Sequence, residues 1–600
     1  MDKPSWRDVV LVPRSVEELD EIVQEYSKKG NILMSTWDDK ELRDIPGSEN
    51  CVKVNLSQLL QSSEPVTGST VPMSKASIFA PDKLRQKMEQ KMKRLQETVG
   101  PDLEIIIEDF KNWAKTQTAQ VLAVRPKTLD QLKKLICAAG VLELKIRCAG
   151  AKHSWAPLFA DSEQMLIYMD KMNSDYPDKS KIYKKTNQDD TVDVHIMAGV
   201  SNEEFKQFQI DNNVNIPANV ILTIVQVASV IVTGCHGVGM DCKCPCDYVV
   251  QMRIVDSNGE LKTYTKETHG EEMMKAAIAN FGLFGVVYDM AIRLECKTTF
   301  VKTINDYVSV KDIFYTERVL EDLVKKNWSV ELFWFPMNKW IPTGGYRLQN
   351  DDVWVRLINK DDEGANHLPG EKYYETQEKY DRYTAEIYSI LHSLFKWNKT
   401  FPLMQHLACS VMKSKIYPTR NDLFEKLPEA VHFRKYTEYV PVYDMEFAFD
   451  LTEQKNYDLI RQATQIVINE VERGYKNSRY PLNVAMEMRF MSHSDGYLCP
   501  ASIVKDKKTK DAKVVYIEIL SLEGSKGWKE FCLVIGTKWM EMGGVPHLAK
   551  QWEFLPDIHR YIRQKFGDRI DSFKEQLRLS GADSNQMFMN EGLRKLLYPE

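Results

Sequence analysis

Two short loops rich in small residues carry the histidines with the clearest chemical potential in this chain. The first, Arg147–Trp155, follows an apolar run and contains Gly150 and His153. The second, Thr233–Gly239, contains His236. Small residues let the backbone approach a ligand closely and direct N–H groups at phosphate oxygens. A histidine in such a loop can be a base, a ligand or a cofactor attachment point. The two loops together predict a site for a large phosphate-bearing cofactor.

A second candidate group lies far downstream, on a segment with strand character. Glu487 and Arg489 are two residues apart, so their side chains share one face of that strand. A guanidinium stays charged and can stabilise negative charge on a reduced cofactor or a substrate oxygen. Lys550, if desolvated near Arg489, would have a lowered pKa and could accept a proton. Glu487, Arg489 and Lys550 are therefore candidate catalytic residues. The alternative is an ordinary ion pair on an exposed strand.

Three closely spaced cysteines raise the question of a metal site. Cys242, Cys244 and Cys246 are separated by single residues, whereas zinc knuckles space their ligands by two or more, and no second ligand pair follows. We predict no metal, and a loop with free thiols. The 11 cysteines of the chain show no regular spacing, which favours a reducing compartment.

The elements that must position these loops alternate between strand and helix. Val121–Val124 is predicted to be a strand and Leu129–Ala139 a helix capped by Thr128. The apolar run Val220–Val232 is predicted to form two strands, or a strand and a turn. Asn258-Gly259 predicts a hairpin turn. This α+β region ends near residue 295, and a second α+β region built on a sheet follows.

The chain is therefore divided into four parts. Residues 1–115 form an N-terminal extension, 116–298 a cofactor-binding domain, 299–535 a substrate (cap) domain, and 536–600 a helical segment that returns to the cofactor-binding domain. Within the extension, Val9–Leu19 resembles Val121–Leu132. The extension is interpreted as a possible degenerate repeat of the first βαβ unit, although such units also resemble one another without common origin.

Composition excludes several classes of function. The chain has 600 residues, 43% of them apolar and 28% charged, as in globular proteins with more than one domain. A net charge of −5 gives no support for nucleic-acid binding. The polar opening has no apolar segment of the kind found in signal peptides, so we expect a cytoplasmic protein. No apolar run reaches the ~20 residues of a membrane-spanning helix.

The order of the motifs resembles that of the vanillyl-alcohol-oxidase-type flavoproteins. The motifs are Arg147-x-x-Gly150-x-x-His153-Ser154, Thr233-Gly234-x-His236-Gly237-x-Gly239 and Phe281-Gly282-x-x-Gly285-Val286-Val287. Later features are similar to the alditol oxidase and sugar-1,4-lactone oxidase branch: Asp444-Met445-Glu446, Glu487-Met488-Arg489 and Pro546-His547-x-x-Lys550. The resemblance covers about residues 115–560. It implies an α+β fold with a two-subdomain (PCMH-type) FAD-binding domain and a cap domain with a central antiparallel sheet.

The resemblance also implies a role for each matching residue. His153 matches the histidine that carries FAD covalently in this family, and Lys152 stands where the family has glycine. The implied cofactor contacts are Gly150, Ala151, Lys152 and Ser154 at the pyrophosphate, Thr233, Gly234, His236 and Gly237 along the ADP and flavin, and Gly282 and Val287 at the adenine–ribose end. Glu446, Glu518 and His547 are implied substrate contacts.

Three hypotheses about function follow. In the first, the protein transfers hydride from a carbinol carbon of a polyol, sugar or sugar lactone to FAD, and O2 or another acceptor reoxidises the flavin. In the second, the same fold performs oxidative cyclisation or desaturation of a specialised metabolite. In the third, the chain is an inactive family member that serves as a binding or scaffold protein, an idea motivated by Lys152.

Overall fold

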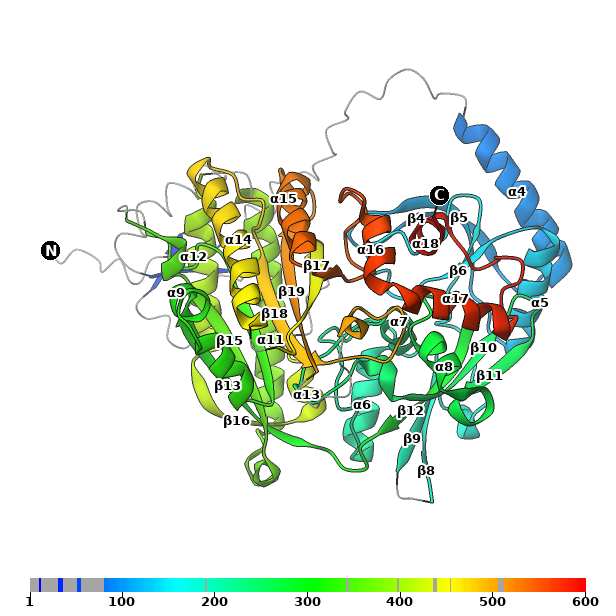
Figure 1. Cartoon of the computed structure of the whole chain (residues 1–600), viewed down its shortest axis with the longest axis horizontal. Coiled ribbons are helices and arrows are strands. Elements are labelled where there is room, and N and C mark those ends of the chain that lie inside the picture. Colours follow the sequence, from blue (N-terminus) through cyan, green and yellow to red (C-terminus); the bar gives the residue numbers. More distant parts are fainter. Residues whose placement is uncertain are drawn as a thin grey trace.

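The computed structural model describes most of the chain. The described residues are 10–11, 31–35, 51–55 and 80–599, apart from 189–190, 342–344, 396–398, 435–439, 454 and 505–511. Side chains are described from residue 84 onward, again outside these gaps and apart from 384, 387 and 390–395. Figure 1 shows two lobes side by side, one built on β4–β12 with the red C-terminal helices and one built on β13–β19.

The first lobe begins with a four-stranded sheet of order β4-β5-β7-β6. Strand β4 is antiparallel to β5, whereas β5 and β6 both run parallel to β7. The bounds are β4 Ile105–Lys111, β5 Thr118–Val124, β6 Ile146–Cys148 and β7 Met165–Ile167, with α4 Ala80–Val99 and α5 Leu129–Val141 beside them. Thr128 caps α5 through a reciprocal pair of hydrogen bonds with Gln131, as its position predicts. Because β6 runs directly into the first loop, this sheet fixes the position of His153.

A five-stranded antiparallel sheet forms the second half of this lobe, in the order β11-β10-β12-β9-β8. Its strands are β8 Ile182–Thr186, β9 Val192–Met197, β10 Val249–Val255, β11 Leu261–Thr265 and β12 Val286–Leu294. Its helices are α6 Asn202–Asn212, α7 Val227–Val232 and α8 Lys266–Ile278. The predicted hairpin joins β10 to β11, with Gly259 at a positive φ of 75°. Helix α7 runs into the second loop and so fixes its position.

The second lobe is built on an antiparallel sheet of eight strands. Its order is β16-β13-β15-β14-β18-β19-β17-β20. The strands are β13 Phe300–Ser309, β14 Ser329–Trp334, β15 Asp352–Lys360, β16 Arg420–Lys426, β17 Val442–Asp450, β18 Ala485–Ser492, β19 Lys513–Leu522 and β20 Val545–Pro546. The predicted α+β class, with two cofactor-domain subdomains and an antiparallel cap sheet, is confirmed.

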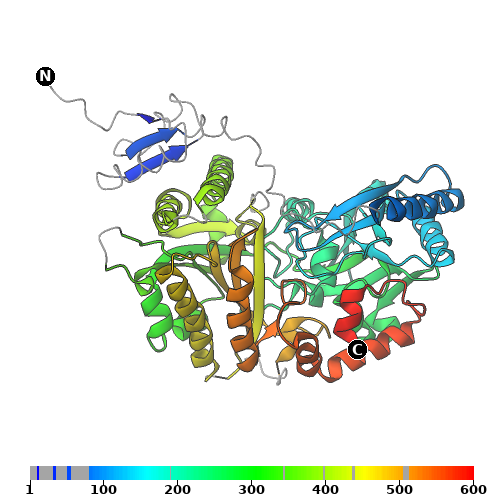
Figure 2. The same cartoon turned by 90° about the horizontal axis from the view of Figure 1, so that it is seen from above.

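Helices cover this sheet from both sides, as Figure 2 shows for α11 and α12 on one side and α14 and α15 on the other. Their bounds are α9 Val310–Tyr315, α10 Val319–Lys326, α11 Glu371–Phe395, α12 Phe401–Val411, α13 Leu427–Val431, α14 Asn456–Lys476 and α15 Trp528–Glu541. Alternation along β17 sends Phe447 against Trp539 of α15, with ring centroids 5.4 Å apart. The neighbouring Glu446 therefore points to the other face, toward the first lobe.

The C-terminal segment crosses back to the first lobe, where Figure 1 shows its red helices. These helices are α16 Ile558–Phe566, α17 Asp568–Ser580 and α18 Glu591–Leu597. The Ile146 N–H donates to the Met587 carbonyl over 2.8 Å. The buried Arg147 guanidinium donates to the carbonyls of Leu158, Phe281 and Phe588. One side chain therefore ties together the first loop, the Phe281 turn and the C-terminal segment.

Two expectations about local structure are wrong. Residues Val227–Val232 form helix α7 rather than a strand, because a short apolar run has no periodicity that separates a buried strand from a buried helix. The boundary predicted at residues 115 and 116 falls between β4 and β5, which pair over their whole length. Strand β4 and helix α4 thus belong to the cofactor-binding lobe.

The N-terminal strands β1 Val10–Leu11, β2 Asn31–Ser35 and β3 Cys51–Asn55 form a separate parallel sheet of order β1-β3-β2. This repeats the order of β5-β7-β6, which are also parallel. The shared order supports the proposal that the extension is a degenerate repeat. Among the described residues, no helix has the length and apolar character needed to cross a membrane.

Candidate active site

A cavity of about 580 Å³ lies between the two lobes and collects most of the predicted site residues. The cofactor candidates that line it are Gly150, Ala151, Lys152, His153, Ser154, Thr233, His236, Gly282 and Val287. The catalytic and substrate candidates that line it are Glu446, Glu487, Arg489, Glu518, His547 and Lys550. Two sets of residues from distant parts of the sequence, positions 150–287 and 446–550, therefore face one space.

The first loop approaches its neighbours closely at position 150, where glycine leaves room for two side chains. A Cβ on Gly150 would lie 2.1 Å from Gln226 Oε1 and 2.8 Å from Ser229 Oγ. In the described part of the chain, Gln226 Oε1 is buried without a hydrogen-bond partner. An orphaned polar atom beside an exposed loop backbone is what a site for a polar ligand requires.

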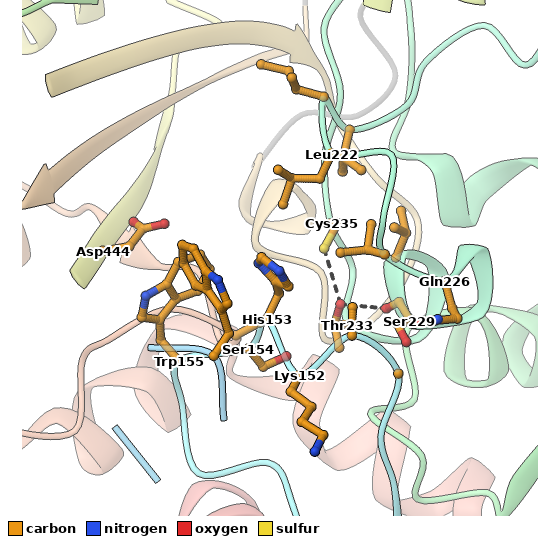
Figure 3. A pocket seen from close by; sticks show the side chains of 18 of the residues that line it. Lys152, His153, Ser154, Trp155, Leu222, Gln226, Ser229, Thr233, Cys235 and Asp444 are labelled. Atoms are coloured by element: carbon orange, nitrogen blue, oxygen red, sulfur yellow. Dashed lines mark hydrogen bonds between the residues drawn. The ribbon is translucent and has the colours of Figure 1, made fainter. Parts of the chain in front are cut away.

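Lys152 adopts the backbone conformation of the glycine that it replaces, with φ at 63°. Its ammonium donates to Glu108 over 2.8 Å, and the Tyr168 hydroxyl donates to the same carboxylate. In Figure 3 the Lys152 side chain extends away from His153, Thr233 and Ser229. Lys152 therefore lies at the edge of the cavity and does not fill it.

His153 points into the cavity between Trp155 and Cys235 (Figure 3). Its ring stacks on Trp113, with centroids 4.4 Å apart and planes inclined by 21°. Burial lowers the pKa of His153 to about 4, with a smaller contribution from the charge of Lys550. Within the described residues, His153 Nδ1 is buried and has no hydrogen-bond partner. The imidazole is thus held in place by Trp113, uncharged at neutral pH, and able to contact a ligand through a ring nitrogen.

The second loop places one histidine against the cap sheet. His236 Nε2 lies 2.8 Å from Glu446 Oε1, and its ring stacks on Tyr516 at 3.6 Å. Burial alone would raise the pKa of Glu446, but His236 and Lys550 hold it well below its usual range. Tyr516 and the carboxylate fix His236 in the wall between the lobes. Thr233 donates to the Ser229 carbonyl over 2.7 Å, which fixes the start of the loop.

Not every predicted cofactor residue faces the cavity. Gly234 and Gly237 do not line it. A Cβ on Gly237 would lie 2.7 Å from the Asn219 carbonyl oxygen, so this glycine allows the loop to pack on its neighbour. A Cβ on Gly282 would lie 3.3 Å from an Arg147 nitrogen. We expect Gly234 and Gly237 to shape the site from behind.

Three glutamates form a row across the cap sheet. Glu446 on β17 is directly opposite Glu518 on β19, which is directly opposite Glu487 on β18. Residues opposite one another on antiparallel strands share a face, so the three carboxylates all face the cavity. Like charges in such a row repel, and the cations of Arg489 and Lys550 offset that repulsion.

Lys550 lies between two carboxylates. Its ammonium contacts Asp444 and Glu518 and lies 4.4 Å from the centre of the Trp155 ring. Burial alone would lower the pKa of Lys550, but Asp444, Glu518 and Glu446 together raise it well above the usual range. The prediction that Lys550 has a lowered pKa and accepts a proton is therefore wrong, because the carboxylates of Asp444 and Glu518 contact its ammonium.

Burial and the charge of Glu518 raise the pKa of Asp444 well above its usual range, although Lys550 opposes the rise. A second carboxyl group of the site, that of Glu487, changes its charge state near neutral pH. Burial raises its pKa to about 7, and Glu518 adds to the rise, although Arg489 opposes it. Arg489 donates to Glu487 over 2.7 Å and lies 3.8 Å from Glu518. The predicted shared face of Glu487 and Arg489 is thus an ion pair, but a buried one at the cavity wall. A carboxylate with this pKa is suited to accept a proton at physiological pH.

His547 lines the cavity and forms no ion pair with any residue that the structure describes. Its Nδ1 accepts a hydrogen bond from the Ala549 N–H over 3.2 Å, and burial lowers its pKa to about 4. The ring is therefore neutral at physiological pH. It stands 6.0 Å from the ring of His236.

The sequence did not indicate several residues of the wall, among them Trp113, Trp155, Gln226, Asp444 and Arg434. Asp444 could have been found, because it lies two residues before Glu446 and so shares its face of the strand. Trp155 is the last residue of the first loop, but an aromatic residue there carries no specific signal. Gln226 and Arg434 are brought in only by tertiary packing.

The residues present fit a flavin dinucleotide. Gly150 and Ala151 line the cavity, and a loop of small residues can direct N–H groups at a pyrophosphate. Among the described residues, the acceptor Gln226 Oε1 and the ring nitrogen His153 Nδ1 are buried without partners. No group of three His, Cys, Asp or Glu side chains in the described parts of the chain is arranged to hold a metal ion.

Comparison with known families agrees with this assignment. A family model described as an FAD binding domain matches residues 121–265, and one described as D-arabinono-1,4-lactone oxidase matches residues 301–596. The two matches follow one another and cover most of the chain. The chain thus carries an FAD binding domain followed by a region that matches D-arabinono-1,4-lactone oxidase. The first match contains both loops and the second contains the glutamate row.

Curated relatives of this flavoprotein are distant. The D-arabinono-1,4-lactone oxidase of Saccharomyces cerevisiae is 25% identical over 186 residues, which are 31% of this chain and 34% of the yeast protein. That of Candida albicans is 24% identical over 230 residues, 37% of this chain and 40% of the relative. The chain thus spans about a third to two fifths of the length of the curated relatives it matches.

Solved structures of the same fold cover more of the flavoprotein. The cholesterol oxidase from B. sterolicum superposes with a TM-score of 0.67 at 16% identity, over 83% of this chain and 98% of that one. A solvent-stable cholesterol oxidase gives 0.65 at 15% identity over the same shares. These likenesses show the two-lobed fold.

Proposed function

We propose that this protein oxidises a CH–OH group with FAD bound in the cavity between the lobes. The observation that supports this most directly is that the two glycine- and histidine-containing loops and the Glu487–Arg489 pair line the same cavity. FAD supplies the hydride acceptor in such a reaction. The remaining tasks are to orient the carbinol carbon, remove the hydroxyl proton, and stabilise the negative charge that develops.

We propose that Glu487 accepts the hydroxyl proton of the substrate. A carboxylate with a pKa near 7 is half ionised at neutral pH, and a general base is most effective when its pKa lies near the operating pH. Arg489 stays charged, because Glu487, Glu518 and Glu331 hold its pKa above the usual range despite burial. We therefore propose that Arg489 stabilises the negative charge that develops on the substrate oxygen. Lys550 stays protonated and contributes positive charge without giving up its proton.

We further propose that His153 carries the flavin covalently. Attachment to carbon requires a neutral imidazole with a free ring nitrogen, and the low pKa of His153 together with its unpartnered Nδ1 supports this. Acid precipitation tests the proposal. Flavin colour that stays with the precipitated protein, and is released in His153→Ser, is the expected result.

The curated relatives make D-arabinono-1,4-lactone and related sugar lactones the first substrates to examine. The test is anaerobic addition of these lactones, and of polyols, to the FAD-loaded protein. Bleaching of the flavin bands, restored by O2, supports an oxidase, and restoration only by an added dye supports a dehydrogenase. An inactive scaffold would show no bleaching with any alcohol. The hypothesis of an inactive scaffold was motivated by Lys152, and it has less support because the Lys152 side chain does not fill the cavity.

A further inference from the structure

The cavity continues past the glutamate row into the cap lobe. This part, which we call the side chamber, lies between the sheet and helices α11 and α12. Its walls include Ala385 and Tyr388 from α11, Ala408 and Cys409 from α12, and Val484 and Leu520 beside and within the strands. Because the side chamber opens onto Glu487 and Arg489, it is the space available for the part of the substrate that does not react.

The polar atoms near the side chamber are directed at other protein groups. The Tyr417 hydroxyl donates to Asp381 over 2.7 Å, and the Tyr388 hydroxyl donates to the Asn483 carbonyl over 3.2 Å. Arg434 also lines the cavity, and its charge acts on Glu487 as well as on Tyr388 and Tyr417. Apart from Arg434 and Asp381, the described residues of the side chamber present a mainly aliphatic and aromatic surface to a ligand.

A distortion of helix α12 contributes to this surface. The helix continues into a π turn, Met412–Ile416, in which the Tyr417 N–H donates to the Met412 carbonyl over 2.9 Å. Turns of this kind occur often at functional sites. The wider turn presents Met412, Ile416 and Tyr417 together to the cavity. The adjacent Val411 does not line it.

Such a wall is unsuited to a polyhydroxylated molecule. Each hydroxyl buried without a partner costs about tenfold or more in binding, whereas each buried CH₂ gains about fourfold. A site that selects a polyol or sugar lactone must offer a hydrogen-bonding group for each hydroxyl. Here such groups concentrate at the reacting end, with Glu487, Arg489 and Lys550.

We infer that the substrate is a carbinol attached to an apolar body, an aliphatic chain or an aromatic or alicyclic ring, that occupies the side chamber. This inference rests on the proposed CH–OH oxidation and names its substrate class. The carbinol and at most one or two further polar groups lie at the glutamate row. The apolar body packs on Met412, Ile416 and Tyr417.

A series of diols with one head group and different tails tests the inference. The FAD-loaded protein is titrated anaerobically with 1,2-propanediol, 1,2-hexanediol, 3-phenyl-1,2-propanediol and D-arabinono-1,4-lactone. Two signals are recorded: perturbation of the flavin spectrum, which reports binding, and bleaching, which reports hydride transfer. Binding is expected to tighten about fourfold per added CH₂ until the side chamber is full, and the phenyl compound is expected to bind more tightly than the lactone.

The two signals separate the inference from the proposed function. Tight binding of the lactone with no gain from longer tails overturns the inference, and bleaching by the lactone in that case leaves CH–OH oxidation standing. Tail-dependent binding without bleaching by any compound supports the side chamber and contradicts CH–OH oxidation.

A matched pair of variants places the binding in the side chamber. Met412→Gln puts a polar group of similar size into the wall and is expected to weaken binding of the phenyl diol about tenfold, with unchanged FAD content. Val411→Gln, one residue earlier and outside the cavity, is expected to leave binding within about twofold of the parent. Equal effects of the two substitutions, or no effect of either, would overturn the inference.

Discussion

Glu487 and Lys550 illustrate how neighbours decide the role of a side chain. Both are buried at the same cavity, and burial disfavours the charge of each. Lys550 is compensated by two carboxylates in direct contact and stays charged. Glu487 has only the single contact with Arg489 and a like charge on the next strand, so its pKa rises to about 7. The sequence identified both residues but could not assign the proton, because their partners lie on other strands and loops.

The rate of flavin reduction is expected to rise with pH and to level off above about 7. A base works in its deprotonated form, and Glu487 loses its proton through this range. Glu487→Gln should lower the rate by about 10²–10⁴ and abolish this pH dependence. Rapid-mixing measurements of anaerobic bleaching from pH 5 to 9 would check both.

Glu518→Gln is the matched comparison for this prediction. The negative charge of Glu518 helps to raise the pKa of Glu487, so its removal should move the midpoint to lower pH while the rise itself remains. A pH profile with an unchanged midpoint in Glu518→Gln, or an unchanged profile in Glu487→Gln, would show that another group takes the proton.

At the scale of elements, the site depends on two connections that leave regular structure abruptly. Strand β6 ends at Cys148 and helix α7 at Val232, and each is followed at once by a loop that lines the cavity. Their contact is so close that Gly150 meets Gln226, the residue that precedes α7. The sequence predicted the first loop from its glycine and histidine. It could not predict the contact, because the apolar run before the second loop has no helical or strand periodicity.

Gly150→Ala is expected to fold but to retain less FAD. The new Cβ would lie 2.1 Å from Gln226 Oε1, and the flexible glutamine side chain would have to move, most easily into the cavity. The FAD-to-protein ratio after gel filtration measures the loss.

Gly370→Ala provides the control, since nothing lies within 4 Å of a Cβ at that glycine. It should keep full FAD content. Equal FAD content in Gly150→Ala and the parent would mean that the close contact at Gly150 does not shape the cofactor site.

For the whole molecule, the decisive feature is that the chain crosses between the lobes and returns. The cap lobe supplies the glutamate row, and the segment after β20 leads back to the first lobe as α16–α18. The motif order predicted both lobes, and the short antiparallel strands were indicated by alternation. The predicted boundary near residue 115 lies after β4, although β4 pairs with β5 of the cofactor-binding lobe. Helix α4, which precedes β4, is highly charged, and a charged helix gives no indication that the strand after it joins a sheet.

Arg147→Met is expected to loosen the return of the C-terminal segment. The substitution leaves three buried carbonyls, those of Leu158, Phe281 and Phe588, without their charged donor. The cost should be about 3 kcal/mol or more of unfolding free energy. Proteolysis and hydrogen exchange would detect earlier opening near residues 583–599.

Arg578→Met tests whether any lost arginine has this effect. Arg578 forms an exposed ion pair with Glu575 on the same helix, so little change is expected. Similar opening in both variants would contradict the role of Arg147 as the link between the three segments.

The visible absorption spectrum of the purified protein, recorded before and after incubation with FAD and gel filtration, tests the central claim most directly. The claim is that the cavity between the lobes is a flavin site. It predicts flavin bands at close to one FAD per chain, reduced in Gly150→Ala. A folded protein that stays colourless after incubation with excess FAD would contradict it.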